Sequence, residues 1–227
     1  MYMYKATAGI WCTLSFFIVA GSIIAFFTPF WLVAPNNAAD NVTVSDKNFI
    51  DAGELTVDAH AACGMMSYCV PYTYHPLNDS FLFSKDAHMQ RCPLYTNFDD
   101  IPTIFGKVSA VMFAAGCVIL LISWIFSAIS LCYGYLCDVS TYLLISVVQL
   151  FCLIINGVAI LLWTLSWDQT DFKCVGEGYC GTLSQFDTGR CEMGWAFLLG
   201  LASTGSILLA VFVGCLSFFL QKQKDES

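Results

Sequence analysis

Charged residues are scarce in this chain. Only 11% of its 227 residues are Asp, Glu, Lys or Arg, whereas 58% are hydrophobic. A soluble globular domain carries about 25% charged residues, so the composition excludes an ordinary soluble fold. The charges leave four long gaps, between Lys5 and Asp40, Lys107 and Asp138, Asp138 and Asp168, and Glu192 and Lys222. This scarcity predicts a protein that resides in a lipid bilayer.

Each charge-free gap is long enough to cross a membrane. About 20 apolar residues, rising 1.5 Å each, span roughly 30 Å of hydrocarbon. We therefore predict a single tetraspan domain over residues 1–227, with transmembrane helices at about 7–33, 104–131, 139–164 and 193–220. The first run is much longer than the apolar region of a signal peptide, roughly 7 to 15 residues, and lacks a small-residue cleavage site. It is therefore interpreted as an uncleaved anchor.

Tryptophan recurs at the predicted helix ends. The first span ends in "FFTPFW", which contains Trp31, and Trp163, Trp167 and Trp195 lie at other helix ends on the same side. Amphipathic rings settle at headgroup depth. We therefore expect these four side chains to be interfacial anchors.

The connecting segments predict the orientation. Large loops occupy about 34–103 and 165–192, and a short loop occupies 132–138. Lys5, Lys222 and Lys224 lie in the short segments, which favours cytoplasmic termini. The sequons "NVT" and "NDS" make Asn41 and Asn78, both in the first large loop, candidate glycosylation sites. Together these features predict a multi-pass plasma-membrane protein with extracellular large loops.

Small and polar residues predict how the helices pack. Gly21 and Ala25 are four residues apart, and Ser206, Ala210 and Gly214 repeat at the same spacing. Such residues allow close helix approach in lipid. Gln149 and Asn156 share one helix face, either as a polar lining for a pathway or as interhelical hydrogen-bonding groups. We favour hydrogen bonding, because no ionisable residue lies mid-membrane; that absence also argues against a transporter, a pump or a self-sufficient channel.

Six of the twelve cysteines lie in the large loops: Cys63, Cys69, Cys92, Cys174, Cys180 and Cys191. In an oxidising compartment disulfides are favoured over free thiols or zinc ligands, although His60 before Cys63 has zinc-like spacing. Spacing alone leaves fifteen pairings open. Cys132 and Cys137 lie next to the predicted inner membrane face, which makes them hypothetical palmitoylation sites.

Several segments resemble known tetraspan families. "GMMSYC", from Gly64 to Cys69, resembles the Gly-x-x-x-x-Cys motif of claudins, but Met66 stands where claudins have Trp. The chain resembles the lipoma HMGIC fusion partner-like (LHFP-like) tetraspan family more closely. That similarity lies in "GIWCTLSFF", "FFTPFWL", "MMSYCV", "VVQLFCLIINGVAILLW" and "CGTLSQFDTGRCEMGWAF", in this order. It is weakest from about residue 36 to 58 and in the tail.

The resemblance implies an all-α membrane fold of the claudin-like superfamily, a left-handed four-helix bundle with a small disulfide-stapled extracellular β-sheet. Carried over by position, Cys69 pairs with Cys92 and Cys180 with Cys191. Cys63 and Cys174 are left over, and we hypothesise that they pair with each other.

No nucleophile and base pair, phosphate loop or cofactor motif is evident, so we expect no enzyme, cofactor, metal site or nucleic-acid partner. The resemblance implies an auxiliary subunit of an ion channel or receptor, of the mechanotransduction or ligand-gated type, with an adhesion protein as a further partner. The alternative is a claudin-like junction or adhesion protein. Its support is an acidic outer face, nine acidic against three basic residues in the first large loop and five against two in the second.

Overall fold

The structure is a computed structural model. It describes residues 2–33, 62–73, 88–91, 94–95, 97–101, 103–131, 135–136, 139–168, 183 and 186–225. The chain divides into two compact units. The helical unit comprises Met1–Phe26, Val108–Leu162 and Leu198–Ser227, and the sheet unit comprises Phe27–Lys107 and Trp163–Phe197.

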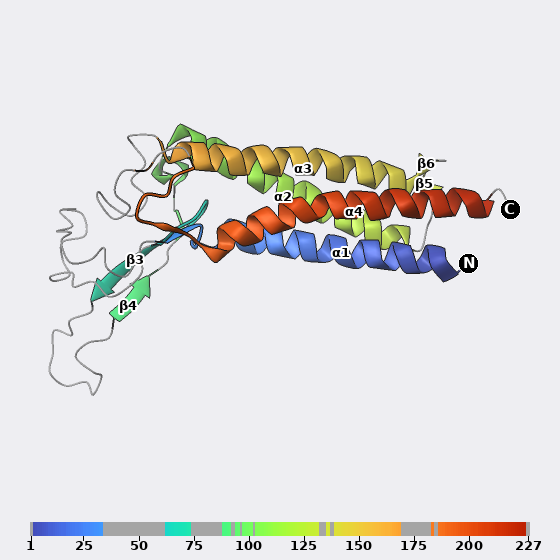
Figure 1. The fold of residues 1–227 in the computed structure, drawn as a ribbon, viewed down its shortest axis with the longest axis horizontal. Helices are drawn as coiled ribbons and strands as arrows, with labels where there is room; N and C mark the ends of the chain where they lie inside the picture. The colour runs from blue at the N-terminus through green and yellow to red at the C-terminus, as the bar shows by residue number, and fades with distance from the viewer. Residues whose placement is uncertain are drawn as a thin grey trace, which may run out of the picture. The chain divides into compact units, whose positions relative to one another are not determined.

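Four long helices dominate the fold: α1 (Tyr2–Phe27), α2 (Ile104–Ser130), α3 (Thr141–Ser166) and α4 (Trp195–Asp225). Each contains a stretch of 22 to 29 residues that is long and apolar enough to cross a membrane. In the helical unit they run side by side, and α1 begins at the end where α4 finishes (Figure 1). With the small sheet described below, this confirms the predicted fold class of a four-span bundle with a small sheet.

Helix α1 ends at Phe27, whereas the sequence predicted a span reaching about residue 33. Pro29 explains the difference, because proline disfavours helical backbone in the residue before it and cannot donate to the helical ladder. The apolar run continues as strand β1 (Leu32–Val33). Hydropathy therefore predicted the apolar run but not where its helix ends.

The helical unit has an apolar core to which all four helices contribute side chains. Its buried members are Ala8, Trp11, Ile18, Val19, Leu120, Tyr142, Ile145, Cys152, Ile207 and Ala210. The outward faces are also apolar, with Phe17, Val118, Phe151 and Phe212 all exposed. Helices that are apolar all round are typical of a membrane span. Between α2 and α3, β5 (Tyr135–Leu136) pairs antiparallel with β6 (Val139–Ser140).

The sheet unit contains a five-stranded sheet in the order β4-β3-β2-β1-β7. Its strands besides β1 are β2 (Ala62–Cys63), β3 (Tyr68–Thr73), β4 (His88–Arg91) and β7 (Glu192–Met193). Every neighbouring pair is antiparallel. Leu32 of β1 lies opposite Cys63 on one side and Met193 on the other, so β1 joins the two large loops.

Two glycines permit close backbone approaches in the sheet unit. A Cβ atom at Gly64, the glycine of "GMMSYC", would collide with the carbonyl oxygen of Thr28. A Cβ atom at Gly194 would collide with the carbonyl oxygen of Phe30. The backbone beside Gly194 is fixed, since Gly194 N–H donates to the Trp31 carbonyl at 3.0 Å. Any side chain at either position would displace the chain that leaves α1.

Candidate functional site

Three tryptophans form the aromatic core of the sheet unit. Trp31 lies 6.1 Å from Trp163 and 5.6 Å from Phe197, measured between ring centroids, and Trp167 lies 6.3 Å from Phe197. All three indoles are fully buried, so their prediction as interfacial anchors was wrong. Trp195 alone of the predicted four is substantially exposed, at 49%. Each such ring pair stabilises a fold by about 0.5 to 1.5 kcal/mol beyond simple burial, so these contacts contribute to the stability of the sheet unit.

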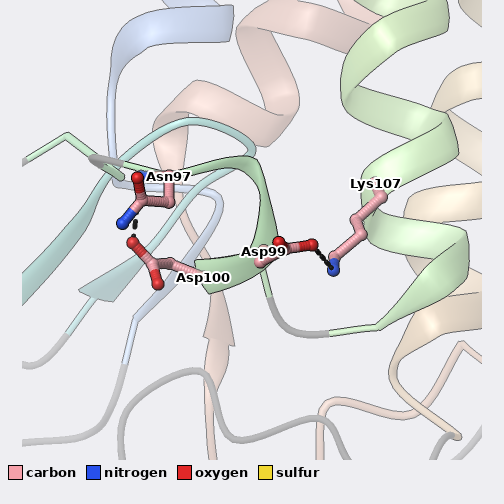
Figure 2. A network of polar contacts seen from close by, with 4 residues as sticks. All are labelled: Asn97, Asp99, Asp100 and Lys107. Atoms are coloured by element: carbon pink, nitrogen blue, oxygen red, sulfur yellow. Dashed lines mark hydrogen bonds and ion pairs between the residues drawn. The ribbon is translucent and has the colours of Figure 1, made fainter.

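A polar corner precedes α2 (Figure 2). The short 3₁₀ helix η2 (Phe98–Asp100) is closed by Asp100 Oδ2, which accepts from the Asn97 backbone N–H at 3.0 Å. Lys107 Nζ contacts Asp99 Oδ1 at 3.1 Å and lies 5.8 Å from the Phe98 ring centroid. Because Asp99 is 95% exposed, the ion pair contributes at most about 1 kcal/mol.

The start of α2 is held by Thr103. Its Oγ1 accepts from the Gly106 N–H at 2.9 Å, as an N-cap does. Thr103 adopts a φ of 127°, an uncommon conformation for a non-glycine residue. The entry to α2 is therefore a conformationally constrained point of the sheet unit.

Among the described titratable side chains of the sheet unit, Tyr95 is the one whose pKa the fold changes most. Burial raises its pKa well above 10, and Tyr68 and Asp100 add smaller effects in the same direction. Its ring packs 5.1 Å from that of Tyr68, and its hydroxyl lies 3.7 Å from Cys63 Sγ. A phenol held in its neutral form acts as a hydrogen-bonding and packing group at neutral pH, not as a base.

The described cysteines fall into two groups. Cys12, Cys117, Cys152 and Cys215 are free thiols in the helices. Cys63, Cys69 and Cys191 are buried and disulfide-bonded. Their predicted partners Cys92, Cys174 and Cys180 lie outside the described residues, as do Asn41, Asn78, Cys132 and Cys137. The three pairings, the two glycosylation sites and the two palmitoylation sites therefore stay predictions.

Metal ligands do not gather in the part of the chain that the structure describes. No three His, Cys, Asp or Glu side chains there are arranged to hold an ion. Cys63, which the sequence placed at zinc-like spacing from His60, is disulfide-bonded. That cysteine is therefore not available as a thiolate ligand.

The predicted packing residues occupy different environments. Gly21 of α1 faces α4, where a Cβ atom would meet Ser203 and Leu199. Ala25, Ala210 and Gly214 are buried, whereas Ser206 is only partly so. In the helical unit, the buried residues of α4 are Gly200, Ser203, Thr204, Ile207, Ala210, Gly214, Ser217 and Gln221. Small-residue spacing alone therefore placed Ser206 about one position off the packed face.

Gln149 lies at the centre of a hydrogen-bonded cluster, here called the inner polar layer. Trp11 Nε1–H donates to Gln149 Oε1 at 3.2 Å, and Gln149 Nε2 donates to Ser15 Oγ at 2.9 Å. The indole of Trp11 also packs against Tyr142 at 5.4 Å, and the Tyr142 hydroxyl donates to the Ser130 carbonyl at 3.2 Å. These are interhelical hydrogen bonds of the kind expected for Gln149, and they join α1 to α3.

Gly214 seats α4 against the inner polar layer. A Cβ atom there would lie 3.0 Å from Trp11 Nε1 and would collide with the Ser146 hydroxyl. The spacing of Gly214 was noticed in the sequence, but not its role beside the indole. The absence of a side chain at this position therefore allows Trp11 to reach Gln149.

Asn156, seven residues or about two turns further along α3, has a different environment. Its side chain is fully buried against Gly116 of α2, where a Cβ atom would collide with the carboxamide oxygen. Neither Asn156 side-chain atom has a hydrogen-bond partner among the described residues, and the hydroxyls of Ser22 and Thr204 also have none. We call Ser22, Asn156 and Thr204 the outer polar layer. Sequence reasoning missed Ser22 and Thr204, although each stands beside a residue of the Gly21–Ser203 contact.

Comparisons with known proteins agree with this architecture. Residues 7–219 match the family described as lipoma HMGIC fusion partner-like protein. LHFPL tetraspan subfamily member 2a protein of Danio rerio is 25% identical over 214 residues, 89% of this chain and 83% of its own. LHFPL tetraspan subfamily member 2 protein of Homo sapiens is 23% identical over 207 residues, with the same coverage. LHFPL tetraspan subfamily member 7 protein of Xenopus tropicalis is 26% identical over 131 residues, 55% of this chain and 64% of its own.

The family match extends from α1 to α4 and includes every strand of the sheet unit. Four apolar helices and a small sheet that joins both large loops are the architecture expected of such a tetraspan protein. The chain is a multi-pass membrane protein that belongs to the lipoma HMGIC fusion partner-like family.

Proposed function

We propose that this protein is an auxiliary subunit that binds an ion channel or receptor in the plasma membrane and supports its assembly, trafficking or gating. Membership of the LHFP-like family supports the proposal. In this proposal both termini are cytoplasmic and the sheet unit is extracellular, stapled by Cys69–Cys92, Cys180–Cys191 and Cys63–Cys174. The disulfide-bonded state of Cys63, Cys69 and Cys191 favours an oxidising compartment for that unit.

The observation that carries the proposal is an exposed aromatic side chain on the sheet unit, at a residue with an uncommon backbone conformation. Phe186 is 58% exposed and has a φ of 64°, in the left-handed region. The turn that follows is fixed, because Asp187 Oδ1 accepts from the Gly189 N–H at 3.0 Å and the Thr188 carbonyl from the Cys191 N–H at 2.9 Å. Non-glycine residues in this region are uncommon and cluster at functional contacts.

An exposed phenylalanine contributes little to the stability of its own fold, since much of its ring remains accessible to solvent. At a protein interface the same ring is a suitable anchor, because an aromatic side chain buries a large area and has few rotatable bonds to order on binding. Phe186 is therefore the residue through which we expect the extracellular domain of the channel or receptor to contact this protein.

Affinity capture of the full chain from native membranes in mild detergent tests the proposal. We expect a channel or receptor subunit to copurify with the wild type, and Phe186→Ala to weaken its recovery strongly. Phe151→Ala, on the exposed apolar face of α3, is the matched control and should not change recovery. Recovery of a channel with Phe186→Ala at the wild-type level would reject this contact. Absence of any channel or receptor from the wild-type capture would reject the function itself.

A claudin-like junction protein remains the second candidate, because the acidic side chains Asp99, Asp100, Asp187 and Glu192 are all exposed on the sheet unit. A negative surface concentrates cations and could line a paracellular path. Expression in an epithelial monolayer distinguishes the two functions. The auxiliary subunit should leave transepithelial resistance unchanged, whereas increased cation permeability would favour the junction protein and overturn the first proposal.

A further inference from the structure

The outer polar layer consists of polar groups that no described residue pairs. Asn156 and Ser22 are fully buried, and Thr204 is 5% exposed. They come from α3, α1 and α4, and none of their side-chain oxygen or nitrogen atoms has a hydrogen-bond partner among the described residues. One unpaired buried polar group costs about 1 to 3 kcal/mol, so three without any partner would be a large defect.

Interhelical contacts place these groups at one depth of the helical unit. Phe26 of α1 stacks on Phe113 of α2 at 6.0 Å. Ser22 lies four residues before Phe26, about 6 Å toward the start of α1 at 1.5 Å per residue. Gly116, which lies against Asn156, is three residues after Phe113, and because α2 runs antiparallel to α1 it lies about 4.5 Å from Phe113 in the same direction as Ser22 lies from Phe26 (Figure 1). Thr204 follows Ser203, which contacts Gly21, the neighbour of Ser22. The three groups thus lie within about one helical turn of the same level.

Three other serines in the helices avoid this cost locally. The Oγ atoms of Ser123, Ser127 and Ser217 each donate to the carbonyl four residues earlier, at 2.8 to 2.9 Å. This back-bonding is the usual way in which a serine satisfies itself inside a helix. Ser22 and Thr204 have no such bond. Their hydroxyls therefore remain able to bind another molecule.

We propose that the outer polar layer is an internal water-binding site, in which ordered water bridges the Asn156 carboxamide and the hydroxyls of Ser22 and Thr204. The three groups supply both donors and acceptors, and a buried water typically makes about three hydrogen bonds. The ligand is neutral, because the helix segments that contain Ser22, Asn156 and Thr204 carry no Asp, Glu, Lys or Arg that could balance a charge. Gly116 is part of the site, since the Asn156 carboxamide occupies the place of a Cβ atom there.

Two buried thiols serve as reporters of such water. Cys117 follows Gly116, and Cys152 is one turn from Asn156; both are free and buried. X-ray radiolysis of ordered water produces hydroxyl radicals in place, and these oxidise neighbouring sulfur even where bulk solvent has no access. The full chain in lipid nanodiscs is irradiated, and oxidation is measured peptide by peptide by mass spectrometry.

The expected result is dose-dependent oxidation of Cys117 and Cys152 in the wild type and loss of that oxidation in Asn156→Leu. Ser123→Ala, which removes a back-bonded hydroxyl, is the matched control and should retain wild-type oxidation. If Asn156→Leu does not fold, the double substitution Ser22→Ala with Thr204→Val provides the same test. Wild-type Cys117 and Cys152 that stay reduced, or oxidation that persists in the folded variants, would overturn the proposal.

Discussion

The amides of the inner and outer polar layers lie on the same helix, α3, but their side chains are paired in one layer and unpaired by described residues in the other. Gln149 and Asn156 are seven residues apart on α3 and both are buried. Gln149 has donor and acceptor contacts with α1, whereas Asn156 has none among the described residues. The difference shows that spacing predicts which face of a membrane helix a polar residue occupies, but not whether the protein itself pairs it. Gly214, beside the Trp11 indole that bonds Gln149, and Gly116, beside Asn156, give each layer a position at which it can be disturbed separately.

The largest expected effect is from Gly214→Leu, which should disrupt the inner layer. The new side chain must displace Trp11 or Ser146, and overpacking of this kind costs about 1 to 3 kcal/mol. We expect a loss of stability at the upper end of this range, because Trp11 would also lose its hydrogen bond to Gln149. Denaturant unfolding of the purified protein in detergent measures the change. Gly205→Leu is the matched control, since no atom lies within 4 Å of its Cβ position, and equal destabilisation by both would contradict the specific role of Gly214.

Replacing the amides directly compares the two layers. Gln149→Leu leaves Trp11 Nε1 and the Ser15 hydroxyl without their partners, so it should destabilise the protein by about 2 kcal/mol. Asn156→Leu removes an amide that no described residue pairs, so its cost should be well below that value. Both variants are measured by the same unfolding assay. A larger loss for Asn156→Leu than for Gln149→Leu would reverse the comparison.

Glycine to alanine changes sharpen the comparison at the outer layer. Gly116→Ala must push the Asn156 carboxamide away, which should cost about 1 kcal/mol or more. Gly157→Ala has open space around its Cβ position and should stabilise α3 by up to about 1 kcal/mol through helix propensity. The midpoint of thermal unfolding should therefore fall for the first variant and rise for the second. Equal shifts would mean that Gly116 does not seat Asn156.

The smallest effects are expected from the two serines on α1. Ser15→Ala leaves Gln149 Nε2 unpaired and should cost about 1 kcal/mol. Ser22→Ala removes a hydroxyl without a described partner and should change stability by less than Ser15→Ala does. Parallel denaturant curves measure the difference. If Ser22→Ala proved the more damaging substitution, the division between paired and unpaired layers would be incorrect.

The sequence was sufficient to predict the number of helices and the family. Both predictions rest on local features, the length of the charge-free stretches and a series of short motifs, and neither requires knowledge of tertiary contacts. It was insufficient for the tryptophans. Trp31 and Trp163 are more than 130 positions apart, and they meet only because Pro29 ends α1 early and the chain then enters the sheet. An interfacial tryptophan and a buried one have the same local sequence signal, so the packing of distant segments had to be known first.

The candidate sites show the same limit. Gly214 and Gln149 were selected by spacing, yet spacing could not reveal that they act on the same indole. Ser22 and Thr204 carried no sequence signal at all, since serine and threonine are common in membrane helices and usually bond to their own backbone. Only the comparison with Ser123, Ser127 and Ser217 makes their unpaired state informative.

Strand β1 has a consequence for how this protein can diverge from its relatives. Two residues, Leu32 and Val33, join β2 and β7 through main-chain groups, so the sheet order does not depend on which side chains fill the loops. The chain between Val33 and Ala62 can then change in length without altering the register of β1 with β2 and β7. That stretch includes residues 36–58, where the resemblance to the family is weakest. New binding specificities can therefore arise in the first large loop while the sheet beneath it keeps its register.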